Sequence, residues 1–340
     1  MKISSRRTRF GDRLCFPDLV PQQLVDIQAA HALRLETVGA HRVDALARSR
    51  LAVPGDLPAL LQADPWLTTV RRVLDWVVAH ADSGDLQEGC LWPDRPERLG
   101  PTVGRPHTVW AMTAACPHEV ACPHEVACRH EVACRHEAGC PKDRPAPDRE
   151  GTAPGQPRRP LQGFLKATSS LAGPYDEIRH PAISERIEPE MELAVVIGSR
   201  SRALDPESAM RAVAGYVGFC DIGAPDVAAL DNHRPDRAKG FDTFGVTGPW
   251  FVTADEIREP HDLRIRSWVN GEPRQDGSTA GMSHSIPEQL AWLSTALTLA
   301  PGDVLSTGTP AGVPGVGPGD VFRGEIQGLG VIENKVVQGD

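Results

Sequence analysis

Two glutamates separated by one residue, Glu190 and Glu192, are the clearest candidates for chemistry in this sequence. Residues i and i+2 of a β-strand lie on one face about 6.5 to 7 Å apart, so both carboxylates can point at the same place. Asp221, at the end of the next predicted strand, could add a third carboxylate. Like charges held this close need a compensating cation.

The types of these side chains indicate which cation would fit. Three carboxylates without a converging histidine favour a hard octahedral ion, Mg²⁺ or Mn²⁺, over Zn²⁺. The apolar run from Leu193 to Ile197 indicates a strand that is buried on both faces. A solvated strand edge is the alternative interpretation of the glutamate pair, and the spacing alone does not exclude it.

Short strands dominate the elements that would position these residues. Strands are expected at 191–197, 216–221 and 263–269. Asn270 and Gly271 form a strong hairpin signal after the third strand, and Ser285 with Glu288 can form a capping box at the start of a helix. Few helices and many short strands predict an α+β, β-rich fold, a roll or barrel-like sandwich with peripheral helices.

Composition divides the chain into three parts. Residues 1–105 have the pattern of a small mixed N-terminal domain, which includes an amphipathic helix that Asp64 and Pro65 can begin. In 106–160, a predicted first strand is followed by a nearly perfect six-residue repeat over 116–140 and by a flexible Pro-rich linker or lid. A compact catalytic domain is expected at 161–340.

Charge and hydropathy limit the kinds of partner. The net charge is −9 and basic residues form no stripe, which argues against nucleic acid. No segment approaches the roughly 18 apolar residues of a membrane span, and the basic start leads into no signal peptide. Only three cysteines lie outside the repeat, which is not a disulfide framework. We therefore expect a cytoplasmic protein without nucleic acid or membrane partners.

Six ordered sequence blocks between Leu161 and Val336 closely resemble the core of the fumarylacetoacetate hydrolase family. They are GFLKATSSLAGPYDEI, EPEMELAVVIG, GYVGFCDIGAPD, KGFDTFGVTGPW, VNGEPRQD and PGDVLSTGTPAGV. Acylpyruvate hydrolases and 2-hydroxyhepta-2,4-diene-1,7-dioate isomerases are the members it resembles. The resemblance implies the family's mixed β-sandwich roll and a homodimer. It also implies that Glu190, Glu192 and Asp221 hold Mg²⁺ or Mn²⁺, with Ca²⁺ as an occasional substitute.

The same resemblance implies roles for five further side chains. Lys239 matches a lysine that faces a substrate oxygen near the metal, where its charge would stabilise a developing enolate. Thr309 matches a loop threonine that binds the substrate carboxylate, and Thr243 lies where the family places a threonine near the lysine. Gln275 and Lys166 resemble pocket-lining positions, and a structural role is the alternative for both.

Two segments depart from the family pattern. Relatives usually carry a segment similar to GLNYxxHxxE, whose His and Glu orient the attacking water, but the repeat occupies its place here. The last repeat unit, RHEAG, is nearest to that segment, so His136 and Glu137 are the predicted catalytic dyad. Pro225 stands where relatives commonly have arginine, which predicts weaker binding of a second acidic group or a less charged substrate.

The repeat itself has two interpretations. Histidine and cysteine recur as HxxxC, so pairs such as His118 and Cys122 would share one face of a helix and could bind Zn²⁺ or sense redox state. The alternative is a tandem expansion that a lid tolerates, and Pro117 and Pro123 oppose a helix at its start.

These features predict an enzyme acting on a small 2-oxo or 2,4-dioxo acid through a metal-stabilised enolate. Carbon–carbon bond hydrolysis of the acylpyruvate or fumarylacetoacetate type is the leading prediction. Decarboxylation or isomerisation of a 2-oxo or 2-hydroxymuconate-type acid is the alternative, which the altered His–Glu segment favours because neither reaction needs an oriented water. A catalytically degenerate binding protein is a further alternative.

Overall fold

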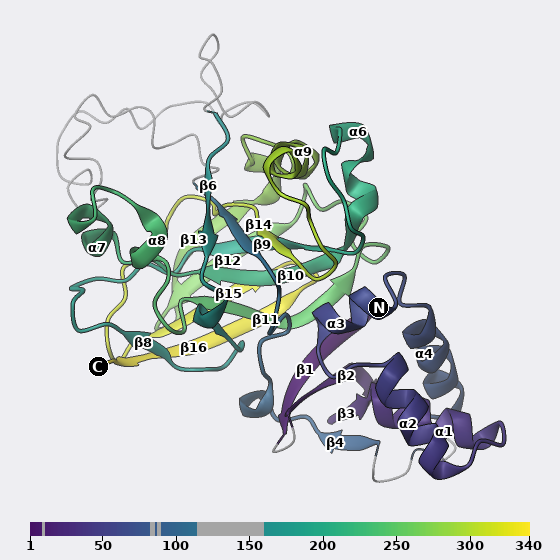
Figure 1. Cartoon of the computed structure of the whole chain (residues 1–340). Helices are drawn as coiled ribbons and strands as arrows, with labels where there is room; N and C mark the ends of the chain where they lie inside the picture. The colour runs from purple at the N-terminus through teal and green to yellow at the C-terminus, as the bar shows by residue number, and fades with distance from the viewer. Residues whose placement is uncertain (9–10, 82–85, 87–89, 114–159) are drawn as a thin grey trace.

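Strands dominate the part of the chain that the computed structural model describes, which is residues 1–8, 11–81, 86, 90–113 and 160–340. They form one sheet of eleven strands and one of five, and helices surround these sheets (Figure 1). The expected β-rich α+β fold with peripheral helices is therefore confirmed. The strand orders of the described sheets are open rather than closed into a barrel, so the roll is the form observed.

The larger sheet joins the two ends of the sequence. Its order is β4-β3-β2-β1-β11-β10-β9-β14-β5-β6, with β7 beside β11. The N-terminal strands are β1 (Lys2–Thr8), β2 (Gly11–Val20), β3 (Gln23–Asp26) and β4 (Leu91–Pro93). The others are β5 (Val109–Met112), β6 (Gly163–Lys166), β7 (Leu171–Ala172), β9 (Met191–Ile197), β10 (Val213–Asp221), β11 (Gly245–Thr253) and β14 (Val304–Ser306). Because Ile3 in β1 pairs with Phe251 in β11, the N-terminal strands extend the C-terminal sheet.

The smaller sheet packs beside the larger one in the order β13-β12-β15-β16-β8. Its strands are β8 (Ile178–His180), β12 (Arg264–Val269), β13 (Glu272–Ser278), β15 (Val321–Ile326) and β16 (Gly330–Gln338). The predicted hairpin lies between β12 and β13. Asn270 and Gly271 have φ values of 52° and 82°, the left-handed conformation that an Asn-Gly turn requires.

Helices flank both sheets. The N-terminal helices are α1 (Ile27–Thr37), α2 (Arg42–Ala52), α3 (Leu57–Ala63), α4 (Thr68–His80) and the 3₁₀ turn η1 (Pro96–Arg98). The later ones are η3 (Thr168–Ser170), α6 (Pro206–Ala209), η4 (Met210–Ala212), α7 (Pro225–Leu230), α8 (Pro235–Ala238), η5 (Thr279–Gly281) and α9 (Ile286–Ala296). The predicted capping box of Ser285 and Glu288 begins α9. None of the described helices has the length and apolar character that crossing a membrane requires.

One predicted helix start was wrong. Asp64 and Pro65 do not begin α4, which starts at Thr68 after Leu67, a residue in the left-handed conformation. The Asp64 carboxylate still accepts hydrogen bonds from the backbone N–H groups of Thr68 and Thr69, at 2.9 and 2.7 Å. The capping chemistry was therefore identified correctly, but the chain makes one more turn before the helix begins.

Strand β9 separates two hydrophobic cores. It lies between β10 and β14, antiparallel to both, and all seven of its residues are buried. Leu193 and Val195 pack into the core shared with the smaller sheet, whereas Ala194 and Val196 pack into the core shared with α3 and α4. The second core joins residues from both ends of the chain, and the sequence-based division into domains stays a prediction.

We expect that Leu193→Ala would lower the free energy of unfolding by about 2–5 kcal/mol, because it removes a fully buried side chain from the centre of the fold. Urea denaturation followed by circular dichroism measures this. Leu230→Ala is the matched control, since Leu230 is 68% exposed and its loss should change stability by no more than about 0.5 kcal/mol. Equal effects of the two variants would contradict this description of the core.

Candidate metal centre

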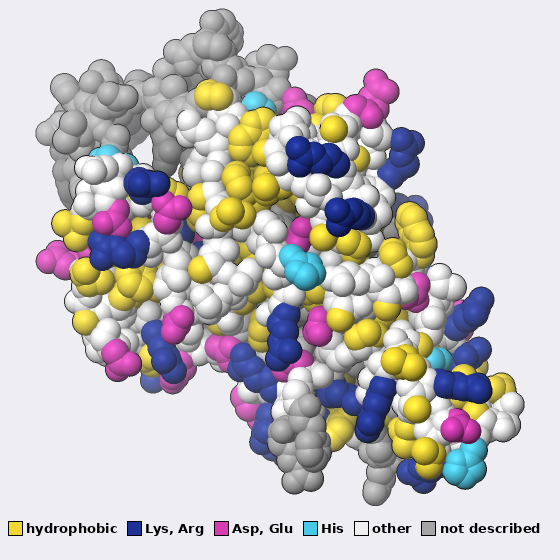
Figure 2. Space-filling view, in the orientation of Figure 1, with side chains coloured by type: hydrophobic (Ala, Val, Ile, Leu, Met, Phe, Trp, Pro, Cys, Tyr) yellow, Lys and Arg dark blue, Asp and Glu magenta, His cyan; other side chains and the backbone are white. Residues whose placement is uncertain are grey.

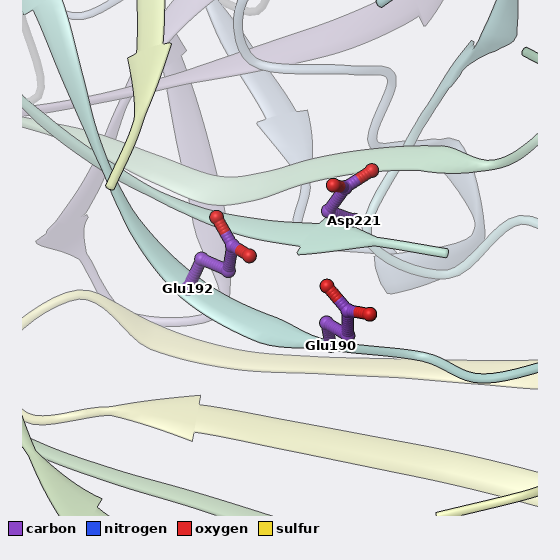
Figure 3. Close-up of side chains that lie close together, drawn as sticks. All are labelled: Glu190, Glu192 and Asp221. Atoms are coloured by element: carbon purple, nitrogen blue, oxygen red, sulfur yellow. The ribbon is translucent and has the colours of Figure 1, made fainter. Parts of the chain in front are cut away.

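The three predicted carboxylates converge at one end of β9. Glu190, Glu192 and Asp221 each offer an oxygen that lies within 4.8 Å of the others (Figure 3). Glu190 directly precedes β9, Glu192 lies within it, and Asp221 ends the neighbouring strand β10. The Asp221 N–H donates to the Glu190 carbonyl oxygen at 2.9 Å, so the pairing of these strands brings the third carboxylate to the first two.

The centre is closed at one end and open at the other. The residues Glu192 and Asp221 are 0% and 1% exposed, whereas the Glu190 side chain is 25% exposed. A ligand would therefore approach from the Glu190 side. Water is excluded from the Glu192 side, which strengthens every electrostatic interaction there.

The Glu192 carboxylate is held by one of its two oxygens. Oε2 accepts hydrogen bonds from the Ser306 hydroxyl and from the Gly308 N–H, the latter at 3.0 Å. Oε1 is buried and has no hydrogen-bond partner among the described residues. An unpartnered carboxylate oxygen in a buried place is costly unless a cation neutralises it. Together with the all-oxygen donor set, Oε1 makes this centre fit for a hard divalent cation.

Two lysines contact the carboxylates. Lys239, which follows α8, has its Nζ 2.9 Å from Glu190 Oε2 and 3.2 Å from Asp221 Oδ2. Lys166, at the end of β6, is fully buried with its Nζ 2.7 Å from Asp221 Oδ1, and it also donates to the Lys239 carbonyl oxygen. When all five groups are ionised, two ammonium groups leave one of the three carboxylate charges uncompensated.

Burial and the lysines shift the titration of these groups in different directions. Burial raises the pKa of Glu190 to about 7 and the pKa of Glu192 well above its usual range. Burial acts on Asp221 as well, but Lys166 and Lys239 outweigh it and lower the pKa of that carboxyl. Burial lowers the pKa of Lys166. For Lys239, Asp221 and Glu190 outweigh burial and raise the pKa, so it stays an ammonium group.

Gln275 and Thr309 contact the backbone between the two glutamates. The Met191 N–H donates to Gln275 Oε1 at 3.3 Å, and the Thr309 hydroxyl donates to the Met191 carbonyl oxygen at 2.9 Å. Gln275 Nε2 donates to Thr309 Oγ1 and to the Pro310 carbonyl oxygen, both at 2.8 Å. Both ends of the Gln275 amide are thus engaged by the protein, which supports the structural alternative for this residue.

Of the remaining predicted site residues, Thr243 is among the described residues and its role stays a prediction, whereas His136 and Glu137 are not described. The Thr243 hydroxyl accepts a hydrogen bond from the Arg179 N–H at 2.9 Å. His136, Glu137 and the whole repeat are outside the described residues, so the dyad and both interpretations of the repeat stay predictions. The sequence analysis did not identify Ser306 and Gly308, although both belong to the STGTPAG segment that directed attention to Thr309.

Comparison with known proteins identifies the family of this chain. Residues 133–337 match the family model described as fumarylacetoacetate (FAA) hydrolase C-terminal. Human mitochondrial oxaloacetate tautomerase is 42% identical over 192 residues, which are 53% of this chain and 60% of that protein.

Two solved structures cover the whole of this chain and are themselves covered completely. Maleylpyruvate hydrolase from Sphingobium sp. SYK-6 is 25% identical with a TM-score of 0.68, and it has also been solved with manganese(II) and pyruvate. The 5-carboxymethyl-2-hydroxymuconate delta-isomerase from Mycobacterium smegmatis is 25% identical with a TM-score of 0.64. These relatives are a hydrolase, an isomerase and a tautomerase, so the matches do not determine one reaction.

Lowering the pH from about 8 to about 6 should weaken Mn²⁺ binding, because protons compete with the cation for Glu190, whose pKa is about 7. The affinity should fall by up to about tenfold per pH unit for each proton displaced. Mn²⁺ titrations followed by electron paramagnetic resonance at several pH values measure this dependence. A dissociation constant that does not rise as the pH falls would count against the assignment of Glu190 as a ligand.

Thr309→Val should lower the Mn²⁺ affinity by about 10–100-fold, because it releases the backbone that spaces the two glutamates. It should also cost about 1–3 kcal/mol of unfolding free energy, since the Met191 carbonyl loses a buried donor. Thr295→Val removes an exposed hydroxyl bonded to the Trp292 carbonyl and is the matched control. If Thr309 serves the substrate alone, Thr309→Val will raise KM and leave Mn²⁺ affinity unchanged.

Proposed function

Because this chain belongs to the fumarylacetoacetate hydrolase family, we propose that it is a divalent-metal-dependent enzyme acting on a small 2-oxo acid. We propose further that its reaction is keto–enol tautomerisation or a related isomerisation through an enolate. The observation that carries this proposal is the placement of the Lys239 ammonium group against Glu190 and Asp221, at the open end of the carboxylate centre.

The carboxylates of Glu190, Glu192 and Asp221 would hold the cation, Mg²⁺ or Mn²⁺, and the relative solved with manganese and pyruvate supports this choice. When bound there, the cation supplies Lewis-acid polarisation of a 2-oxo group and neutralises part of the developing enolate charge. Ser306 and Gly308 would pre-position Glu192 for this through its Oε2, and its Oε1 has no hydrogen-bond partner among the described residues.

The two lysines would have separate tasks. Lys239 is the more exposed, with 14% of its side chain accessible, so its ammonium group can donate to the substrate oxygen on which negative charge develops. Lys166 has no exposed side-chain surface and contacts Asp221 and the backbone of Lys239. It would act as a positioning residue that fixes one carboxylate and one catalytic lysine relative to each other.

These described residues account for stabilisation of an enolate; the base that would take the proton next to the 2-oxo carbon is not assigned among them. Hydrolysis also needs an oriented water, and the dyad predicted for that task lies outside the described residues. The 42% identity to an oxaloacetate tautomerase supports tautomerisation as the reaction that uses this enolate. The intact carboxylate and lysine set argues against a degenerate binding protein.

Carbon–carbon bond hydrolysis is the second candidate, and it was the leading prediction from the sequence. The whole-chain similarity to maleylpyruvate hydrolase supports it. In that reaction the same enolate would be the leaving group, so the lysines would keep their roles. Assembly as a homodimer remains a proposal that rests on the resemblance to the family.

Purified enzyme with Mg²⁺ or Mn²⁺ should accelerate the loss of enol absorbance of oxaloacetate without releasing CO₂ or pyruvate. Hydrolysis would instead convert acetylpyruvate or fumarylpyruvate to pyruvate and a second acid, which chromatography separates.

Lys239→Met should lower kcat by about 10²–10³-fold while Mn²⁺ binding is retained, because it removes a donor to the enolate oxygen. Lys335→Met, which changes an exposed lysine in β16, is the control. If metal-loaded protein turns over none of these acids, the proposed function is wrong.

A further inference from the structure

A buried arginine in the N-terminal part of the larger sheet has two guanidinium nitrogens without an acceptor among the described residues. Arg6 in β1 is only 9% exposed, and its guanidinium carbon lies 4.2 Å from the centroid of the Trp92 ring. Its Nε and Nη1 atoms are buried and have no hydrogen-bond partner among the described residues. An arginine cannot lose its charge at ordinary pH, so this cation is stacked on an aromatic face but otherwise unpaired.

Further hydrogen-bond donors belong to the segments that contact Arg6. Trp92 Nε1 is also buried and without a partner in the described part of the chain. The bridge between Arg6 and Leu99 brings η1 alongside β1, and with it the exposed side chains of Arg95 and Arg98. On the face seen in Figure 2, Lys and Arg side chains are frequent around the N-terminal strands labelled in Figure 1.

Asp26, a carboxylate whose charge acts on Arg6, is already engaged. Its Oδ1 accepts hydrogen bonds from the Ala29 N–H and from Arg13 Nη2, and its Oδ2 accepts from Arg13 Nε, all at 2.9 Å. Burial lowers the pKa of Arg6, and the charges of Arg98 and Arg95 lower it further. Among the described residues, Arg6 Nε, Arg6 Nη1 and Trp92 Nε1 thus have no acceptor, and the charges of two further arginines act on Arg6, in a chain whose net charge is −9.

We propose that Arg6, Trp92, Arg95 and Arg98 form a binding site for a small oxyanion, a carboxylate or a phosphate. An oxyanion supplies acceptors for the N–H groups of Arg6 and Trp92. Its negative charge would offset the free-energy cost of burying the Arg6 guanidinium. Trp92 fixes the plane of that guanidinium, so the direction of its N–H groups is set before the anion binds. The site is separate from the carboxylate centre, because β11 lies between β1 and the strand that carries Asp221.

Thermal unfolding of the full chain in sodium phosphate, sodium acetate and sodium chloride at equal ionic strength tests this site. Phosphate or acetate should raise Tm by about 2 °C in a saturable way, because an anion that binds only the folded chain stabilises it. Arg6→Met should abolish the saturable rise, and the double variant Arg95→Met with Arg98→Met should weaken it at least tenfold. Arg48→Met removes an exposed arginine of α2 and should respond like the wild type.

The Tm of Arg6→Met in sodium chloride alone shows whether Arg6 serves anion binding or the packing of the folded chain. Removing an unpaired buried charge while keeping the apolar stem on Trp92 should leave Tm unchanged or raise it. If phosphate and acetate raise Tm equally in all four proteins, or in none, the proposed site does not exist. The double variant keeps the test decisive if Arg6→Met fails to fold, since Arg95 and Arg98 are exposed. A response to phosphate alone or to acetate alone identifies the class of oxyanion.

Discussion

The repulsion among three buried carboxylates is the constraint on which the C-terminal half of this protein depends. One glutamate directly precedes a central strand, the second lies at its second position, and an aspartate ends the strand beside it. Nothing in the apolar surroundings of β9 would hold three such charges together without compensation. Two lysines and a hydroxyl- and glycine-containing loop supply part of that compensation, and a proton or a bound cation would supply the rest.

The same strand links this centre to the packing of the whole chain. From Leu193 onward, alternate side chains of β9 enter two different cores, one shared with the smaller sheet and one with the N-terminal helices. The polar end of the strand is therefore held by hydrophobic contacts on both faces. Met191, between the glutamates, is held through its backbone by Gln275 and Thr309, which come from two other parts of the fold. Hydrophobic contacts of β9 and hydrogen bonds to the Met191 backbone thus both fix the positions of the carboxylates.

Local features of this arrangement could be predicted from the sequence, and features that depend on register could not. The apolar run of β9, the Asn270-Gly271 turn and the capping box of α9 are signals carried by neighbouring residues, and all three were confirmed. Ser306 reaches Glu192 only because β14 pairs with β9, a contact between residues more than a hundred positions apart. Lys166 was expected in the pocket lining, but its full burial against Asp221 follows from sheet order. The start of α4 was misplaced because Leu67 adopts a conformation that its residue type does not favour.

The central claim is that these three carboxylates form one cation site, and calorimetric titration of the metal-free protein with Mn²⁺ tests it most directly. The account predicts one Mn²⁺ bound per chain, complete loss of binding in Glu192→Ala, and unchanged binding in Glu207→Ala, which alters an exposed glutamate of α6. Wild-type affinity in Glu192→Ala, or no binding to the wild-type protein, would contradict it.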